Sequence, residues 1–197
     1  MSSNRQAAGK EGRVVVISGP SGVGKGTICA EVVKRLDDVY VSVSVTTRPK
    51  AATETDGEEY WFVSKQEFQR RIDKGLFLEY AEVFDSFYGT PKDKVEQALN
   101  EGKIVILEID VQGGRAVKAV YPDAVMIFIL PPDKKELTRR LTTRGRDKAE
   151  TAAKRLGLAG NEVAEAAGYY ENMVVNDDLD RAVQEVINII KGKTKGK

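Results

Sequence analysis

Short hydrophobic runs alternate with amphipathic stretches along most of this chain. The β-branched runs at Arg13–Ser18, Ile104–Ile109 and Ala124–Leu130 are typical of buried parallel strands. A fourth, shorter strand is predicted at Met173–Val175. Strands that alternate with helices imply an α/β fold, a parallel sheet with helices on both faces. Apolar residues three and four positions apart predict those helices in a stretch ending at Leu36, at Asp93–Asn100, at Gln112–Val120, from an Asp133 cap to Arg144, and at Asp180–Ile190.

Other segments depart from this rhythm. Valines at every second position from Val39 to Val45 alternate with polar residues or tyrosine, which predicts one strand with an apolar and a polar face. Thr46–Thr90 is rich in Thr, Glu, Asp, Gly and aromatic residues, and we interpret it as an insertion of short strands with one helix near Lys65–Lys74. Arg144–Lys154 is charged and predicts a mobile loop. We therefore expect a polar N-terminus (1–12), a core (13–45 and 91–190), an inserted subdomain (46–90) and a basic tail (191–197).

Composition narrows the possible chemistry. The 197 residues suit one domain, and 31 basic against 30 acidic residues leave a net charge of +1, without the basic excess typical of nucleic-acid binding. The chain has no histidine, which excludes a Ser-His-Asp triad and a His-ligated zinc. Its single cysteine allows no internal disulfide. We see neither an apolar run of about 20 residues nor a secretory signal, and expect a cytoplasmic protein without membrane contact.

A glycine-rich segment joins the first predicted strand to the first helix. Its sequence is Gly19-Pro-Ser-Gly-Val-Gly-Lys25-Gly-Thr27. Glycines let backbone N–H groups converge on phosphate oxygens at a helix N-terminus, and Lys25 supplies a mobile positive charge. Gly26 stands where a Ser or Thr that ligates Mg²⁺ usually follows the lysine. Either Thr27 serves phosphate or metal from the next position, or Mg²⁺ is held mainly by water and nucleotide.

The insertion and the chain beyond it contain the motifs Ser42-Val-Ser-Val-Thr-Thr-Arg48, Asp56-Gly-Glu-Glu-Tyr60-Trp-Phe-Val63, Phe77-Leu-Glu79-Tyr-Ala-Glu, Tyr88-Gly-Thr90, Leu107-Glu-Ile-Asp110-Val-Gln-Gly113, Arg140-Leu-Thr-Thr-Arg144-Gly and Val174-Val-Asn176-Asp-Asp178. Taken together and in this order, these motifs resemble those of guanylate kinases, and the resemblance covers residues 13–190.

The resemblance implies a P-loop NTP-hydrolase-like core, a small mixed β/α GMP-binding insertion at 46–90 and a lid at 140–156. It also implies transfer of the γ-phosphoryl group of ATP to GMP, and to dGMP, giving ADP and GDP in purine nucleotide metabolism. ATP would bind with Mg²⁺, and the protein would be a monomer or homodimer. The implied ATP-binding residues are Gly19, Pro20, Ser21, Gly22, Val23, Gly24, Lys25, Gly26, Thr27 and Asn176.

For GMP, the resemblance assigns Glu79 to the guanine N1–H and 2-amino donors, which a carboxylate accepts together. It assigns the hydroxyls of Ser44 and Thr90, and the carboxylate of Asp110, to the base as well. Glu108 would lie near the metal and phosphates. The GMP phosphate would meet Arg48, Tyr60 and Tyr88, whereas the second arginine usual three residues after the first is here Ala51, beside Lys50. We therefore expect weaker GMP binding than in a typical relative.

The resemblance also gives the cations that surround the transferred phosphoryl group, namely Lys25, Arg48, Arg140, Arg144 and Arg155. Asp177 and Asp178 either belong with Asn176 near the adenine or cap the last helix. Two alternatives remain: a non-catalytic guanylate-kinase-like binding module, and a kinase for another nucleoside monophosphate. Lys25 and the lid arginines argue against the first, and the insertion argues against the second.

Overall fold

A central parallel sheet organises the computed structural model, which describes residues 11–83, 85–143, 157 and 160–192. Its five strands all run in the same direction, as the sequence predicts. Their order is β2 (Val39–Val41), β7 (Ile104–Glu108), β1 (Arg13–Ser18), β8 (Val125–Leu130) and β9 (Asn172–Val175). The expected α/β class is confirmed.

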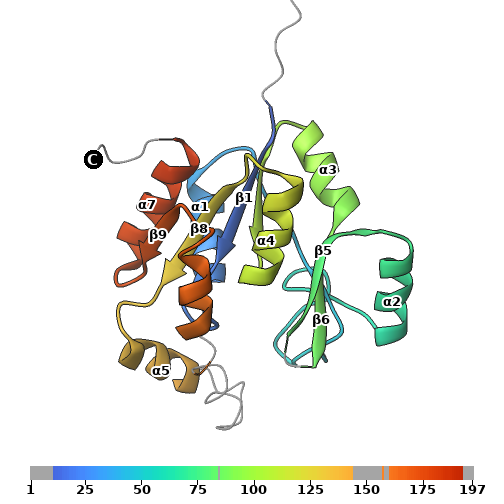
Figure 1. Ribbon diagram of the computed structural model, residues 1–197, viewed down its shortest axis with the longest axis horizontal. Coiled ribbons are helices and arrows are strands. Elements are labelled where there is room, and N and C mark those ends of the chain that lie inside the picture. Colours follow the sequence, from blue (N-terminus) through green and yellow to red (C-terminus); the bar gives the residue numbers. More distant parts are fainter. Residues whose placement is uncertain (1–10, 84, 144–156, 158–159, 193–197) are drawn as a thin grey trace, which may run out of the picture.

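Alternate residues of β1 serve two separate hydrophobic layers. Val15 and Ile17 pack with α1 (Lys25–Arg35) and α7 (Leu179–Ile190) on one face of the sheet. Val14 and Val16 pack against the opposite layer, with α3 (Lys92–Asn100), α4 (Val111–Val120) and Ala166. Because both faces are covered, every residue from Val14 to Ile17 is buried, and the strand is a continuous apolar run. Figure 1 shows α7 and α4 on opposite sides of β1.

The segment after β2 forms a second, smaller sheet beside the core (Figure 1). Helix α2 (Lys65–Asp73) begins at Ser64, whose hydroxyl accepts a bond from the Glu67 N–H. Phe68 of this helix is buried and stacks on Phe77, with ring centroids 4.5 Å apart. The predicted mixture of short strands and one helix is therefore confirmed. The strand order is β4 (Trp61–Phe62), β3 (Val45–Thr46), β6 (Ser86–Pro91) and β5 (Phe77–Val83).

The prediction of one strand from Val39 to Val45 is wrong. The Ser42 N–H still bonds to Ile106 of the core sheet, whereas the Ser44 carbonyl accepts a bond from Trp61 of the second sheet. The chain therefore changes sheets within residues 42–44. Alternation of apolar and polar residues persists through this change because each of the two short strands separately covers a hydrophobic layer.

The C-terminal part follows the predicted helices, with one addition. Helix α5 (Lys134–Thr143) is capped by Asp133, whose carboxylate accepts the Glu136 N–H at 2.7 Å. Asp178 caps α7 by accepting the Arg181 N–H at 2.9 Å, so the capping interpretation holds for this residue. A helix at 160–166, which the sequence patterns did not indicate, lies between them in the chain. Among the described helices, none has the length and apolar character needed to cross a membrane.

Candidate active site

The glycine-rich loop connects β1 to α1, where the carboxyl end of a parallel strand meets a helix N-terminus. Lys25 is the first residue of α1, and its ammonium donates to the carbonyls of Gly19 at 2.7 Å and Pro20 at 3.3 Å. Gly24 precedes the helix with φ of 102°, and a Cβ on it would lie 2.6 Å from the Asn176 amide nitrogen. A larger residue would therefore be strained and would clash.

Asn176 stabilises the glycine-rich loop through a hydrogen bond to its backbone. Its buried amide Nδ2 donates to the Val23 carbonyl at 2.8 Å, and Arg140 donates to the same carbonyl at 3.1 Å. Arg140 also bonds to the Asn176 carbonyl at 3.1 Å and to Glu136 at 2.8 Å. These contacts tie α5 and the end of β9 to the loop, and so fix the backbone that would surround a phosphate.

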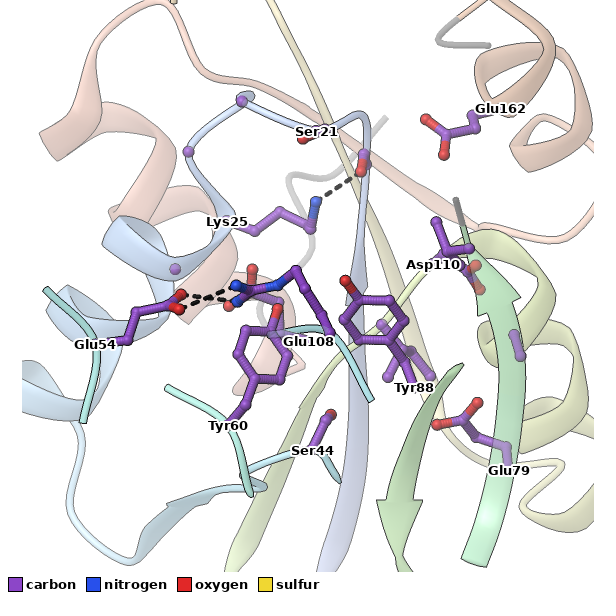
Figure 2. A pocket seen from close by; sticks show the side chains of 18 of the residues that line it. Ser21, Lys25, Ser44, Glu54, Tyr60, Glu79, Tyr88, Glu108, Asp110 and Glu162 are labelled. Carbon is purple, nitrogen blue, oxygen red and sulfur yellow. Dashed lines mark hydrogen bonds and ion pairs between the residues drawn. The ribbon is translucent and has the colours of Figure 1, made fainter. Parts of the chain in front are cut away.

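A cavity of about 430 Å³ lies between this loop and the second sheet (Figure 2). It brings together the phosphate-binding loop and most of the residues that the sequence assigns to GMP, although they come from distant parts of the chain. Its described lining consists of Gly19, Ser21, Gly22, Gly24, Lys25, Gly26, Ser44, Arg48, Ala51, Glu54, Tyr60, Glu79, Ala81, Val83, Tyr88, Glu108, Ile109, Asp110 and Glu162.

Glu79, on β5, is the buried carboxylate at one end of the cavity. The Thr90 hydroxyl donates to it at 2.5 Å across the β5–β6 pair. Burial, helped by the charge of Asp110, raises the pKa of Glu79 to about 7, while the Thr90 bond opposes the rise. A Cβ on Gly113 would lie 2.7 Å from the carboxylate, so the absence of a side chain there makes room for it. Thr90 itself is fully buried and does not belong to the described lining of the cavity.

The opposite end of the cavity carries a cation and two tyrosines. Arg48 donates from both terminal nitrogens to the Glu54 carboxylate, at 3.0 and 2.8 Å. Its guanidinium carbon lies 5.4 Å from the centre of the Tyr60 ring, and the Tyr60 and Tyr88 rings meet edge to face at 5.7 Å. Burial raises the pKa of Tyr60 to about 12, so at neutral pH this hydroxyl carries its proton and can donate it in a hydrogen bond.

Three further acidic side chains, Asp110, Glu108 and Glu162, line the same cavity. Asp110 caps α4 by accepting the Gly113 N–H at 2.8 Å, which orients a residue that the sequence assigns to the base. Glu108 reaches the first turn of α1, since its carboxylate lies 3.4 Å from the position that a Cβ on Gly26 would take. Glu162 comes from the helix at 160–166, and its carboxylate points toward the cavity (Figure 2). Burial raises the pKa of Glu162, and nearby Lys25 partly offsets this.

Some predicted site residues lie elsewhere. Thr27, Arg140 and Asn176 line a second cavity of about 480 Å³ on the other side of the loop, together with Gly22, Gly24, Arg139, Asp177 and Leu179. Pro20 and Val23 contribute backbone carbonyls to the loop network, and Val23 is fully buried. Arg144 and Arg155 lie outside the described residues, as does most of the predicted lid. Lys50 is absent from the described lining of the first cavity, whereas Ala51 belongs to it.

Three contributors were missed by sequence reasoning. Glu54 and Glu162 are acidic residues in polar stretches, where the sequence pattern does not distinguish them from solvated side chains. The third is Tyr170, whose hydroxyl donates to Ser18 at 2.6 Å, while Ser18 donates to the Ile109 carbonyl at 2.7 Å. This buried chain of bonds joins the end of β1, the start of α4 and the segment after the 160–166 helix. The signal for Tyr170 was weak, because Gly114, which makes room for its hydroxyl, is an ordinary helix residue in the sequence.

A parallel sheet with a phosphate-binding loop after its first strand, and a cavity that extends from that loop onto an inserted subdomain, defines a P-loop nucleotide-binding protein. The family model for guanylate kinase matches residues 11–193. The chain therefore belongs to the guanylate kinase family.

Individual relatives agree with this assignment. The chain is 47% identical over 176 residues to a guanylate kinase of Carboxydothermus hydrogenoformans, covering 89% of this chain and 86% of that protein. It is 48% identical over 180 residues to one of Symbiobacterium thermophilum, covering 91% and 85%. The crystal structure of guanylate kinase from Anaplasma phagocytophilum superposes with a TM-score of 0.78 at 31% identity, covering 95% of this chain and 89% of that one.

Proposed function

We propose that this protein transfers the γ-phosphoryl group of ATP to GMP, giving ADP and GDP. The observation that carries the proposal is one cavity in which the loop lysine, Lys25, and the buried carboxylate of Glu79 both take part. A phosphate-binding loop alone would fit many nucleotide enzymes. A buried carboxylate at the far end of the same cavity selects among acceptors, because its chemistry suits one nucleobase.

Guanine presents adjacent N–H donors at N1 and at the 2-amino group, and ionised Glu79 can accept both. Adenine presents a lone pair at N1, which would face the carboxylate and leave two acceptors opposed. Since the carboxylate is buried, such a mismatch would cost much more than it does in water. Ser44 lines the same cavity and offers its hydroxyl to the base. We assign the residues 46–90 to the GMP-binding subdomain on this ground.

The acceptor phosphate would lie at the Arg48 end. Arg48, Tyr60 and Tyr88 there supply a charged fork and two phenolic donors for phosphate oxygens. The attacking phosphate oxygen is already anionic, so the reaction needs no general base. Catalysis then rests on positioned positive charge around a loose phosphoryl transition state, to which Lys25 contributes from the loop. Arg140, on the ATP side, and the lid arginines Arg144 and Arg155 complete the proposed set of cations.

The residues around the loop fit a Mg²⁺ ion that is held mainly by water and nucleotide. In the ranges that the structure describes, His, Cys, Asp and Glu side chains form no group of three or more that could hold a metal ion. Glu108 lies beside Gly26 at the loop. It would hold Mg²⁺ through water, with the remaining positions taken by water and nucleotide oxygens, as is usual for this ion. When bound, Mg²⁺ neutralises charge on the β- and γ-phosphates.

A substrate panel tests the proposal. Purified protein with ATP and Mg²⁺ is given GMP, dGMP, IMP, AMP, CMP or UMP in separate reactions, and nucleoside diphosphates are separated by chromatography. We expect GDP from GMP, slower turnover of dGMP, and little product from AMP or the pyrimidine nucleotides. Preference for another monophosphate would make the protein a different kinase. Nucleotide binding by calorimetry without any turnover would identify a non-catalytic module.

A further inference from the structure

Glu54 is a deeply buried acidic residue beside Arg48. Only 1% of its side chain is exposed. Its carboxylate accepts both terminal nitrogens of Arg48, at 3.0 and 2.8 Å, and the backbone N–H of Ala51 at 2.8 Å. Lys50 donates its ammonium to the Glu54 backbone carbonyl at 2.7 Å. Glu54 is therefore the common partner of three positions in the loop between β3 and β4.

Arg48 is held from several sides as a result. Besides its two bonds to Glu54, it donates to the Pro49 carbonyl at 2.9 Å. Its guanidinium carbon lies 5.4 and 5.5 Å from the ring centres of Tyr60 and Phe62. These bonds use three of the five N–H donors of the guanidinium. Tyr88 is a further hydrogen-bond partner of Arg48, and the group still lines the cavity that an incoming anion would enter.

Glu54 has two opposite effects on phosphate binding, and the direction in which the affinity changes distinguishes them. Its negative charge repels an anion, so neutralising it alone would strengthen phosphate binding. Its bonds also order a long side chain in advance, and releasing Arg48 would make the ligand bear that ordering cost. Bidentate geometry and burial favour the second effect, because an arginine fork is useful only when its plane is fixed.

We propose that Glu54 is a positioning residue for the acceptor phosphate: it fixes the Arg48 fork before the nucleotide binds and thereby determines where that phosphate lies. The inference rests on the proposed function, since it names Arg48 as a phosphate ligand. Glu54 does not touch the substrate itself and acts through Arg48. The effect should therefore require both the phosphate on the ligand and the guanidinium on Arg48.

The test uses Glu54→Gln, which keeps the size of the side chain, and compares GMP with guanosine by calorimetry. We expect GMP to bind about tenfold more weakly and guanosine to bind as before, because guanosine has no phosphate for Arg48 to hold. In steady-state assays the KM for GMP should rise about tenfold, and the KM for ATP should change less than about twofold. The control is Glu59→Gln, an exposed carboxylate of the same loop that accepts the Thr55 N–H, which should bind both ligands normally.

A double-mutant cycle isolates the route through Arg48. In an Arg48→Gln background, Glu54→Gln should change GMP affinity less than about twofold. Equal losses for GMP and guanosine, stronger GMP binding by Glu54→Gln, or a full tenfold loss without Arg48 would each overturn the proposal. If Glu54→Gln does not fold, Glu54→Asp, whose side chain is one methylene shorter and so holds the fork less well, should give an intermediate loss for GMP alone. Absence of GDP formation by the unmodified protein would instead refute the proposed function.

Discussion

The hydroxyl of Thr90 donates a 2.5 Å hydrogen bond to the carboxylate of Glu79, and both side chains are buried. The bond stabilises the ionised form of Glu79, whereas burial and Asp110 stabilise the protonated form. The balance leaves the pKa of Glu79 at about 7. The group proposed to recognise guanine therefore titrates at physiological pH.

Guanosine should bind more weakly as the pH falls. With a pKa of about 7 for Glu79, its ionised fraction drops from about nine tenths at pH 8 to about one tenth at pH 6. Only the ionised form accepts both guanine donors, so the affinity should fall about tenfold over this range. Calorimetry with guanosine measures this without the titration of the GMP phosphate. Constant affinity between pH 6 and 8 would contradict the prediction.

Thr90→Val should move that titration upward. Valine keeps the shape of the side chain but cannot donate to Glu79, so the pKa of Glu79 rises above its value in the parent protein. We expect guanosine affinity at pH 7 to fall several-fold, roughly threefold to tenfold, and to recover partly at pH 8, where guanine still keeps its N1 proton. Thr47→Val is a control in the same subdomain, because its hydroxyl accepts the Phe87 N–H away from Glu79. An unshifted pH profile for Thr90→Val would disprove the role of this bond.

Glu79→Gln should stabilise the ligand-free protein at alkaline pH. The folded-state pKa of Glu79 lies above its ordinary value of 4.5, so the folded protein binds this proton more tightly and loses stability as the pH rises from 4.5 to 7. Between pH 5 and 8 the parent should lose about 2 to 3 kcal/mol of unfolding free energy that the variant keeps. Urea unfolding at the two pH values measures the difference. Parallel losses in parent and variant would be the contrary result.

Ala51→Arg should tighten GMP binding. Ala51 lines the cavity beside Arg48, so a guanidinium placed there could reach the same phosphate. We expect the KM for GMP to fall about threefold to tenfold, with little change for ATP. Lys50→Ala is the matched comparison, since the Lys50 ammonium is bonded to the Glu54 carbonyl, and it should leave the KM for GMP nearly unchanged. An unchanged KM in Ala51→Arg would show that the alanine does not weaken GMP binding.

Two glycines of the loop should respond differently to alanine. Gly24→Ala must adopt φ near 102° and places Cβ 2.6 Å from Asn176, so the loop backbone must shift. We expect the KM for ATP to rise at least about tenfold. Gly26→Ala meets only the Glu108 carboxylate at 3.4 Å and should stay within about threefold of the parent. Similar kinetics for the two variants would contradict this account of the loop.

Hydrophobic patterns in the sequence predict correctly those elements whose residues are all buried in the same surroundings. Val14–Ile17 lie in the middle of a sheet covered on both faces, so burial and β-branching agree there. The prediction of one strand from Val39 to Val45 is wrong because alternation with a period of two indicates which residues are buried. It does not indicate which sheet buries them. The helix at 160–166 was missed since its sequence, 160-GNEVAEA-166, offers few apolar positions.

Some residues of the site are likewise recognisable from the sequence, whereas others are not. Gly19–Thr27 was recognisable because backbone geometry restricts the residues that a phosphate-binding loop can use. Glu54 and Tyr170 were not, since their importance comes from partners that only the folded chain brings close: Arg48 for one, and Ser18, 152 residues away, for the other. Arg140 illustrates a further limit. The motif identifies the residue, but only the fold shows that it lines the second cavity and that its guanidinium bonds to the Val23 and Asn176 carbonyls.

The change of sheet at residues 42–44 leaves Val43 alone between a bond to the core and a bond to the second sheet. At the other connection, Pro91 ends β6 and α3 starts at the next residue. The subdomain that would bind the base is thus joined to the core by two very short links. Such links leave it little freedom to move relative to the core strand that leads into the phosphate-binding loop. A base bound out of place would therefore also displace its phosphate relative to ATP. Selection among nucleobases should therefore appear in kcat as well as in KM.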